Sequence, residues 1–404
     1  MAKTGTVGFR DNKTQKKVSP FIGGADGDWL HIEGMHMGET GSLTKWNGMD
    51  KIVGLIESQP FPEAPNRITG LFVANPSLGQ RYVLATGLTG VHKLDVASGL
   101  WSTLQTGRAA EITDFSKMFM LNDIVYVFDG VNGNVQTNGT TLFNLGIVPP
   151  TPAPTVTVTV GGVITAGTRT YVVTYVNSNF GYGVQESNPS SASLPAVFAA
   201  NQQGIVTIPV STDLQVAERR IYRTTAGGSV HRFVATVANN TSTLFTDNVP
   251  DANLGIAVER FANGVPPIFD TVEVSRGVLF GTPRLTSTIH FCANQQPHAL
   301  HPSDSRVLNQ NDGDSIVRIK ELNGDIIAFK QNSIWSGFGD DRLSFGWDRV
   351  VNEIGAVNHH GVIDFVGRPV LAFTSSRGVD IFNGTSEQKI YSDIDPVYRS
   401  FSGG

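Results

Sequence analysis

The sequence is poor in cysteine, in long apolar runs and in charge, and each absence excludes a class of protein. A single cysteine among 404 residues, Cys292, can form neither an internal disulfide nor a zinc site of the CxxC type. No stretch approaches 18 consecutive apolar residues, so we expect no membrane insertion. The N-terminus lacks the apolar core of a signal peptide, which favours synthesis and assembly in a cytoplasm.

Charged residues make up 16% of the chain, against about 25% in an average protein, and the net charge is −5. This balance gives no reason to expect a surface that wraps nucleic acid. We interpret the basic run at 10–17 as a solvated arm, with a nucleic-acid contact as the alternative. Glycine is abundant, with 44 of 404 residues or about 11%, but it shows no collagen period.

Helical periodicity is almost absent from the sequence, whereas short β-rich runs bounded by turn residues recur along its length. Residues 211–226 are the helix-like exception, and we interpret their segment 220–223 as a strand. The sequence therefore predicts an all-β protein.

The most informative pattern is an internal repeat, in which an apolar strand is followed by a short polar turn and a second strand. Five copies occur, at 82–85 with 90–94, 124–128 with 134–136, 277–280 with 288–292, 325–329 with 333–335, and 369–373 with 378–382. Turn signals precede several copies, namely Asn122-Asp123, Asn323-Gly324 and Gly367-Arg368. Repeated hairpins are typical of a propeller-like or curved array of blades, each of which buries one face against the next.

Proline-rich breaks at 148–154 and 264–267 enclose a segment of different composition, without lysine or tryptophan from 155 to about 255. Its strand signals have the spacing of a β-sandwich and lie at 155–160, 168–177, 204–210, 219–224, 229–237 and 243–247. The pattern, with Tyr171, Val173 and Tyr175 on one face, resembles a fibronectin type III-like sandwich. We therefore predict an N-terminal arm (1–20), a propeller-like domain in two parts (21–148 and 264–404) and an inserted sandwich (149–263).

No catalytic or phosphate-binding template occurs in the sequence. We accordingly predict no catalytic, cofactor-binding or metal-ligating residue, no cofactor and no enzyme activity. A metal site at Cys292, His298 and His301 is conceivable, but a core cysteine with surface histidines is the favoured interpretation. The pair His359-His360 is interpreted as the flank of a turn.

Acidic clusters are also interpreted as turns. The string 309–314 resembles a calcium loop, but its glycine lies one position too early. Asp340 with Asp341, and Asp393 with Asp395, are paired carboxylates of the kind that glycoside hydrolysis uses. The glycines around 337–341 favour a solvated hairpin tip instead. The sequons at Asn138 and Asn383 are each followed by glycine, which favours hairpin turns.

Two C-terminal segments contain more specific sequence features than a generic β pattern. One runs from 327 to 355 and includes Phe329-Lys330, Asn332-Ser333 and Trp335; the other runs from 361 to 384 and includes Arg377-Gly378. Together with an early Gly-Gly-Ala-Asp element at 23–26, they resemble the blade repeats of the tail nozzle proteins of short-tailed bacteriophages, also called tail tube or packaged-DNA stabilisation proteins. The resemblance covers about 20–148 and 256–395.

This resemblance implies a structural protein of the virion tail, assembled in the host cytoplasm and without an active site. Members form a ring, usually of six subunits, below the portal and adaptor. The ring provides the DNA exit channel and helps to retain and release packaged DNA. The implied partners are further copies of the chain, the portal, the adaptor, other tail proteins, and passing double-stranded DNA bound without sequence specificity. Two alternatives stay open: a carbohydrate-binding or carbohydrate-degrading β-propeller with an accessory sandwich, and a receptor-binding protein of the virion.

Overall fold

The computed structural model describes the chain from residue 61 to residue 389, with gaps at 63–67, 78, 110–115, 179–182, 310–311, 341–343 and 365–367. Four short strands are also described nearer the N-terminus: β1 (Phe21–Gly23), β2 (Trp29–His31), β3 (Met35–Met37) and β4 (Leu43–Lys45). They pair as two antiparallel hairpins, β1 with β2 and β3 with β4. The predicted arm at 1–20, with its basic run, and Asp393 and Asp395 lie outside the described residues.

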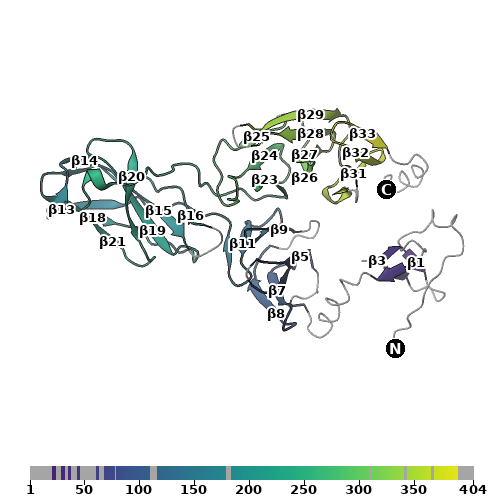
Figure 1. Cartoon of the computed structure of the whole chain (residues 1–404), viewed down its shortest axis with the longest axis horizontal. Coiled ribbons are helices and arrows are strands. Elements are labelled where there is room, and N and C mark those ends of the chain that lie inside the picture. Colours follow the sequence, from purple (N-terminus) through teal and green to yellow (C-terminus); the bar gives the residue numbers. More distant parts are fainter. Residues whose placement is uncertain are drawn as a thin grey trace.

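Five antiparallel sheets of four strands make up most of the described chain, and each is a meander of consecutive strands (Figure 1). Sheet 1 comprises β5 (Gly70–Ala74), β6 (Tyr82–Thr86), β7 (Val91–Asp95) and β8 (Trp101–Gln105); sheet 2 comprises β9 (Lys117–Leu121), β10 (Ile124–Phe128), β11 (Val135–Thr137) and β12 (Leu142–Asn144). Sheet 3 comprises β22 (Thr271–Ser275), β23 (Val278–Thr282), β24 (Thr288–Phe291) and β25 (Ser305–Val307). Sheet 4 comprises β26 (Ile316–Leu322), β27 (Asp325–Lys330), β28 (Ser333–Phe338) and β29 (Gly346–Asn352); sheet 5 comprises β30 (Val362–Asp364), β31 (Leu371–Ser375), β32 (Gly378–Phe382) and β33 (Glu387–Lys389).

The five predicted strand pairs are the second and third strands of these five sheets, so the predicted repeat is confirmed. The second strands have the most continuous apolar sequences because both of their faces are covered; β10, for example, is buried at every position. Several outer strands that the pattern missed, such as β8 and β12, are only partly buried, and their sequences are correspondingly mixed.

The first and second strands of sheets 2, 3 and 4 are joined by the same kind of tight turn. Its two central residues both have positive φ, at 51° and 64° in Asn122-Asp123 and at 55° and 91° in Asn323-Gly324. This turn matches the right-handed twist of the strands and is favoured by asparagine and glycine. The turns predicted at these two places are confirmed, whereas Gly367 lies outside the described residues.

Neighbouring sheets of the array pack face to face in chain order, and an apolar cluster fills each of the four interfaces. Representative buried pairs are Leu84 with Val127 (sheets 1 and 2), Phe128 with Phe269 (sheets 2 and 3), Phe280 with Ile319 (sheets 3 and 4) and Phe329 with Phe373 (sheets 4 and 5). Within the described residues no such cluster joins sheet 5 back to sheet 1. The array therefore curves like a letter C with its ends apart (Figure 1).

A two-sheet sandwich lies between sheets 2 and 3 in the chain. Its strands are β13 (Thr155–Ile164), β14 (Gly167–Arg169), β15 (Tyr171–Asn177), β16 (Gln185–Glu186), β17 (Ala196–Phe198), β18 (Gln202–Thr207), β19 (Glu218–Thr224), β20 (His231–Val237) and β21 (Leu244–Asp247). One sheet has the order β16-β15-β19-β20, the other has the order β13-β18-β21, and β14 pairs with β17. Strands occur at all six predicted places, and the strand interpretation of 220–223 is confirmed. The predicted strand at 168–177 is divided into β14 and β15, which pair in different sheets, and β16 and β17 were not predicted.

The core of the sandwich contains Tyr171 and Val173, as expected from their shared face. Tyr175 continues that face into a separate small cluster with Ile147 and Val216. The segment between β12 and β13, predicted as a proline-rich linker, contains no strand. Strands from 155 to 247 form sheets only with one another in the described chain, and the domain boundaries themselves stay predictions.

Three buried glutamines join the sandwich to sheet 2. Gln136 of β11 donates from Nε2 to Oε1 of Gln185 of β16 at 2.9 Å, and Gln185 returns the same bond at 3.1 Å. Gln215 donates to the backbone carbonyl of Gly146 at 3.0 Å, and the three side chains belong to residues no more than 3% exposed. Because mutually satisfied buried amides require one geometry, the sandwich is held in a defined orientation on the array.

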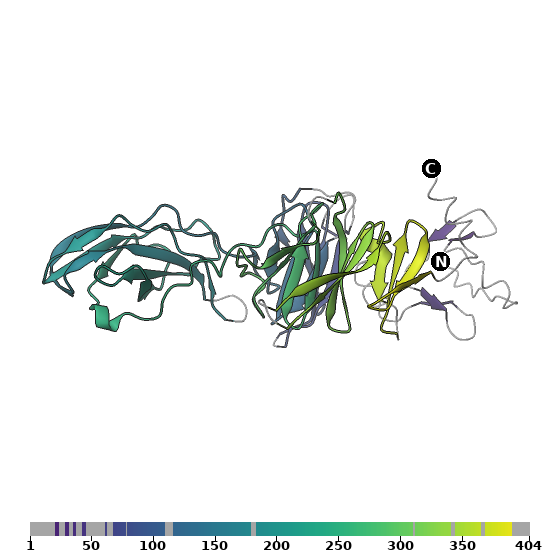
Figure 2. The same ribbon diagram turned by 90° about the horizontal axis from the view of Figure 1, so that it is seen from above.

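The resulting molecule is elongated, with the sandwich projecting from one side of the stacked sheets (Figure 2). The described helical segments are the short 3-10 turns η2 (Asp251–Asn253) and η3 (His359–Gly361). In the part of the chain that the structure describes, no helix has the length and hydropathy to span a bilayer.

Candidate functional site

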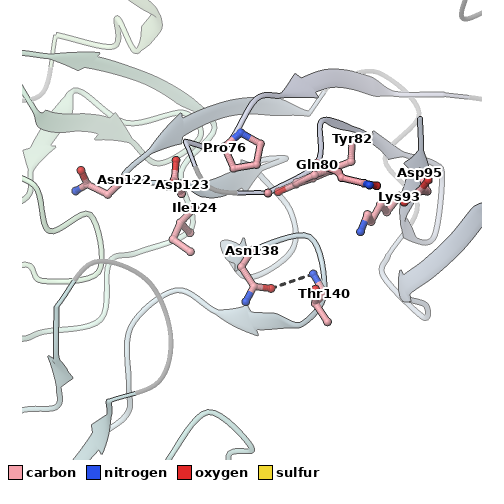
Figure 3. A pocket seen from close by; sticks show the side chains of 11 residues that line it. Pro76, Gln80, Tyr82, Lys93, Asp95, Asn122, Asp123, Ile124, Asn138 and Thr140 are labelled. Atoms are coloured by element: carbon pink, nitrogen blue, oxygen red, sulfur yellow. Dashed lines mark hydrogen bonds between the residues drawn. The ribbon is translucent and has the colours of Figure 1, made fainter. Parts of the chain in front are cut away.

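A polar cleft of about 540 Å³ opens between sheets 1 and 2 (Figure 3). Sheet 1 contributes β6, β7 and the loop before β6, whereas sheet 2 contributes the start of β10, the β9–β10 turn and the β11–β12 turn. The residues around the cleft are Pro76, Gly79, Gln80, Tyr82, Lys93, Asp95, Asn122, Asp123, Ile124, Asn138 and Thr140. The cleft therefore exists only because two consecutive repeats lie side by side.

Tyr82 has the most unusual environment in this cleft. Tyr82 is only 3% exposed, and its hydroxyl has no hydrogen-bond partner among the described residues. The ring packs on the β11–β12 turn at Gly139, where a Cβ atom would lie 2.7 Å from the ring and where φ is 83°. Burial, and then the charge of Asp123, raise the pKa of Tyr82 to about 12, so the hydroxyl keeps its proton and can donate.

Asp123 is held in place by the opposite sheet. The backbone N–H of Ser77 donates to its Oδ1 at 2.8 Å, and the Ser77 hydroxyl donates to its Oδ2. Both carboxylate oxygens are thus used to tie the loop after β5 to the β9–β10 turn. This carboxylate fixes the width of the cleft and is poorly placed to act as a base.

Lys93 and Asp95 lie on the wall formed by β7. The Lys93 ammonium is 5.1 Å from the centroid of the Tyr82 ring, within the range of a cation–π contact. Hydrogen bonds from the backbone N–H and hydroxyl of Ser98 lower the pKa of Asp95, which keeps this carboxylate ionised. The cleft therefore presents a cation, carboxylates, amides and a phenol, a set suited to binding a small polar ligand.

The residues considered as a metal site do not form one. Cys292 is fully buried, and its Sγ contacts the carbonyl oxygen of Pro297 at 3.2 Å. His301 instead contacts the Ser303 hydroxyl at 2.7 Å. No group of three histidine, cysteine or carboxylate residues suited to a metal occurs among the described residues. The expected core position of Cys292 is confirmed.

The expectation of surface histidines was wrong for His298, which is only 7% exposed. This residue lies in the loop after β24, between the buried Cys292 and the buried Leu300, and it is enclosed when sheet 3 packs on sheet 2. Burial lowers the pKa of His298 to about 4, so the ring is neutral at physiological pH. His359 and His360 lie in η3, in agreement with the predicted turn flank.

The acidic residues lie in turns, as predicted. Asp340 follows β28 with an exposed side chain that pairs with Arg276, and Asp341 lies outside the described residues. In the calcium-like string, Asp312 accepts from the Lys330 ammonium at 2.5 Å, and Asp314 accepts from the backbone N–H of Gln331 at 2.7 Å. These protein donors occupy the oxygens that a calcium ion would need.

Asn138 and Asn383 cap equivalent turns, between the third and fourth strands of sheets 2 and 5. The Oδ1 of Asn138 accepts from the backbone N–H of Thr140 at 2.9 Å, and the Oδ1 of Asn383 accepts from that of Thr385 at 3.0 Å. The interpretation of both sequons as turns is confirmed.

Comparison with known proteins gives no relative for this chain. No family model matches it, and no curated protein matches it. Similar solved structures include the extracellular domain of a one-component system from B. thetaiotaomicron, with 11% identity over 83% of this chain and 50% of that protein and a TM-score of 0.22. Others are a GH74 xyloglucanase from Xanthomonas campestris (9% identity, 83% of this chain, 63% of that one, TM-score 0.22) and dipeptidyl peptidase 4 from Porphyromonas gingivalis (8%, 85%, 55%, 0.21). The chain thus spans 50% to 63% of these proteins, and likenesses of this size support no inference about its activity.

Proposed function

We propose that the chain is a structural subunit of the tail of a short-tailed bacteriophage. Copies of it form a nozzle ring below the portal and adaptor, and this ring provides the DNA exit channel and helps to retain and release packaged DNA. The observation that carries the proposal is the position of the residues that resemble the nozzle family. Phe329-Lys330 ends β27, and Gly378 begins β32 directly after Arg377, so both pairs lie beside the turn between the second and third strands of consecutive sheets.

The Phe-Lys phrase has a structural role that supports this proposal. Lys330 is fully buried, and its ammonium donates to the carbonyl oxygen of Leu308 at 2.9 Å as well as to Asp312. Asp314 accepts from the backbone N–H groups of Gln331 and Asn332 in the next turn. These hydrogen bonds hold the loop between sheets 3 and 4 against the β27–β28 turn. A structural role therefore explains why Lys330 and the polar residues after it occur here.

The proposal also includes a more specific interpretation of the sheet array and of the sandwich. The five stacked sheets are interpreted as blades of a propeller-like domain, since each is a four-stranded meander and the apolar clusters of the described residues join each sheet to its neighbours in the chain. The sandwich is interpreted as fibronectin type III-like, supported by its two facing sheets and the order β16-β15-β19-β20. Its fixed junction with sheet 2 suits a subunit whose parts keep one arrangement in a ring.

The charge of the chain is compatible with passing DNA. With a net charge of −5 per chain, a ring of several copies carries a net negative charge. Cationic walls would release counterions from the phosphates and bind the DNA strongly, which would slow its passage.

Mass photometry of the full chain, alone and mixed with portal and adaptor particles, tests the proposal. We expect a species at a multiple of 43.4 kDa, formed alone or on the particles. A chain that stays monomeric in all of these conditions would contradict it.

The cleft between sheets 1 and 2 favours a second candidate, a receptor-binding or carbohydrate-binding protein of the virion. Sugars are bound by side chains of the kind found there, and the buried Tyr82 hydroxyl offers an unused donor. A glycan array with the full chain and with Tyr82→Phe tests this candidate. Binding that the variant loses would support it, and absence of binding to any glycan would exclude the carbohydrate-binding form of this candidate.

A further inference from the structure

The two sheets of the sandwich differ in how their edges are covered. Along β20, the segment 255–258 forms backbone hydrogen bonds of 2.9 to 3.0 Å with Phe233 and His231. Along β15, three serines donate from their backbone N–H groups to carbonyl oxygens of the strand and accept from its N–H groups through their hydroxyls: Ser187, Ser190 and Ser193. Both edges of the sheet β16-β15-β19-β20 are thus covered by other segments of the same chain, which prevents pairing with another molecule.

The three-stranded sheet β13-β18-β21 has two edge strands, β13 and β21, and the described chain gives them no such cover. The Gly161 N–H donates to the carbonyl oxygen of Asn201 at 2.8 Å, and the Ile208 N–H donates to that of Thr243 at 2.9 Å. In an antiparallel pair, residues that bond to the neighbouring strand alternate with residues that point away from it. These two bonds and the strand register therefore identify the backbone groups that point away from β18, namely those of Val156, Val158, Val160, Leu244 and Thr246.

The backbone groups on these two edges have no hydrogen bond within the described residues. The edges also lack the exposed charges and prolines that usually prevent a further strand from pairing. Residues 155–160 of β13 are threonine and valine only, and Asp247, the one charged residue of β21, is buried against Arg223. Two bare edges on opposite sides of one sheet are therefore open to a further strand.

We propose that β13 of one copy pairs with β21 of the next, so that the three-stranded sheets of neighbouring subunits join edge to edge. The occupant is a second copy because the two edges lie on opposite sides of one sheet, so each copy supplies the strand that its neighbour lacks. Val158 and Phe245 both pack on the core of the sandwich, so the pairing also continues the apolar face from one copy to the next. The inference rests on the ring proposed above, because a head-to-tail contact repeated by rotation forms a ring.

The two strands of this contact run parallel. β13 and β21 are both antiparallel to β18, so they run in the same direction within a subunit. In a parallel pair, the C=O of Leu244 and the N–H of Thr246 bond to the same residue of β13. An antiparallel contact with aligned core faces would instead bring β13 beside a second β13, leave β21 bare and stop at a dimer. Because β21 has only four residues, we expect the contact to strengthen the ring rather than to hold it alone.

Cysteine cross-linking of the full chain on portal and adaptor particles tests the pairing. The native Cys292 is fully buried and gives little background. Thr157→Cys and Leu244→Cys place thiols on the two edge strands, where both native side chains are exposed. A short bismaleimide should give a covalent dimer in rings assembled from a mixture of the two variants, and in rings of neither variant alone. A dimer from Thr157→Cys alone, or rings without any cross-link, would overturn the inference and leave the proposed ring intact.

A proline variant tests the hydrogen bonds of the same contact. Thr246→Pro removes an N–H that does not bond to β18, and edge strands tolerate proline at such positions, so the subunit should stay folded. Thr246→Val keeps the N–H and is the matched control. In mass photometry we expect the proline variant to need at least a tenfold higher concentration than the control to half-saturate the particles. Equal concentrations would overturn the inference, whereas a native chain that forms no ring would overturn the proposed function as well.

Discussion

The sheet array and the sandwich of this protein are stabilised in different ways. The array is held mainly by apolar clusters between successive sheets, and buried ion pairs such as Lys330 with Asp312 and Arg108 with Asp129 lie within it. The sandwich encloses one apolar core between its own two sheets and adds a buried network of charged groups at one end of that core. Damage to the array should therefore stay local, whereas damage to the sandwich should affect all of it.

The buried network centres on Arg223. Its Nε donates to Asp247 at 2.6 Å, and its Nη1 donates to Asp251 at the same distance. Arg169 also donates to Asp251, and the Tyr171 hydroxyl donates to Asp247 at 2.8 Å. Although burial alone would raise it, the hydrogen bonds from Arg223, the Ala226 backbone and Arg169 lower the pKa of Asp251. Arg223 and Asp247 are fully buried, so neither tolerates the loss of its partner.

The largest expected effect comes from Arg223→Met, which leaves Asp247 as a buried charge without its partner. Removing one member of a buried ion pair costs about 3–5 kcal/mol, and we expect the upper end because two carboxylates are affected. Hydrogen exchange, followed by peptide mass spectrometry, should show faster exchange over all of 155–247 and unchanged exchange in sheets 1 to 5. The exposed Arg232→Met is the control, with little change expected. Loss of protection in the array as well would show that the two regions unfold together.

Phe329→Ala should break the array at a single interface. Phe329 is fully buried and lies 5.2 Å from the ring of Phe373 in sheet 5, so the truncation should cost about 3–4 kcal/mol. All tryptophans lie outside 155–255, and Trp101, Trp335 and Trp347 belong to sheets 1 and 4. Denaturant unfolding followed by tryptophan fluorescence therefore reports on the array and the N-terminal chain, and not on the sandwich. The exposed Phe338→Ala on β28 should change the free energy of unfolding by less than about 1 kcal/mol. Equal costs for the two variants would contradict the role of the interface cluster.

The junction between the two regions should respond less strongly. Gln185→Leu leaves the buried amide of Gln136 without its reciprocal partner, which costs about 1–3 kcal/mol. The double variant Gln136→Leu with Gln185→Leu should recover most of this loss, because both polar groups are then removed. Denaturant titration of the three proteins measures the recovery. A double variant no more stable than Gln185→Leu would show that the amide pair is not a unit.

The smallest effect concerns pH, and it separates the two regions. Burial, together with the charge of Arg260, lowers the pKa of His231 in the sandwich to about 4, and burial lowers that of His298 in the array to about 4. The folded protein favours the neutral rings, so stability is complete above about pH 6.5 and falls as the pH drops toward 4. We expect a loss of about 1 kcal/mol per histidine at pH 5.5.

Single variants assign this loss to its region. In hydrogen exchange measured between pH 5 and 7, with rates corrected for the intrinsic pH dependence, His231→Gln should flatten the response of the sandwich only. His298→Gln should flatten that of sheets 2 and 3 only. A variant that changes both regions would argue for a single cooperative unit.

The fold could be predicted from the sequence where strands are covered on both faces. The apolar second strands of the five sheets, such as β10 and β27, and their Asn-Asp and Asn-Gly turns carry strong local signals. The fourth strands are only partly buried and mixed in sequence, so no pattern marked them. His298 was misjudged because its burial arises from the packing of sheet 3 on sheet 2, which local sequence does not encode.

The candidate cleft could not be predicted, for a similar reason. Tyr82 and Asn138 are 56 positions apart, and each reads locally as an ordinary strand or turn residue. They meet only because consecutive sheets stack. The one local signal was a pair of turns, Asn122-Asp123 and Asn138-Gly139, which predict chain reversals but do not show that both line one cleft.

Electron microscopy of the full chain bound to portal and adaptor particles tests the central claim most directly. The account predicts a ring of identical subunits below the adaptor, with the sheet arrays forming its wall and the sandwich of each subunit held at one fixed angle. Particles without added density, or single copies attached at random places, would contradict it.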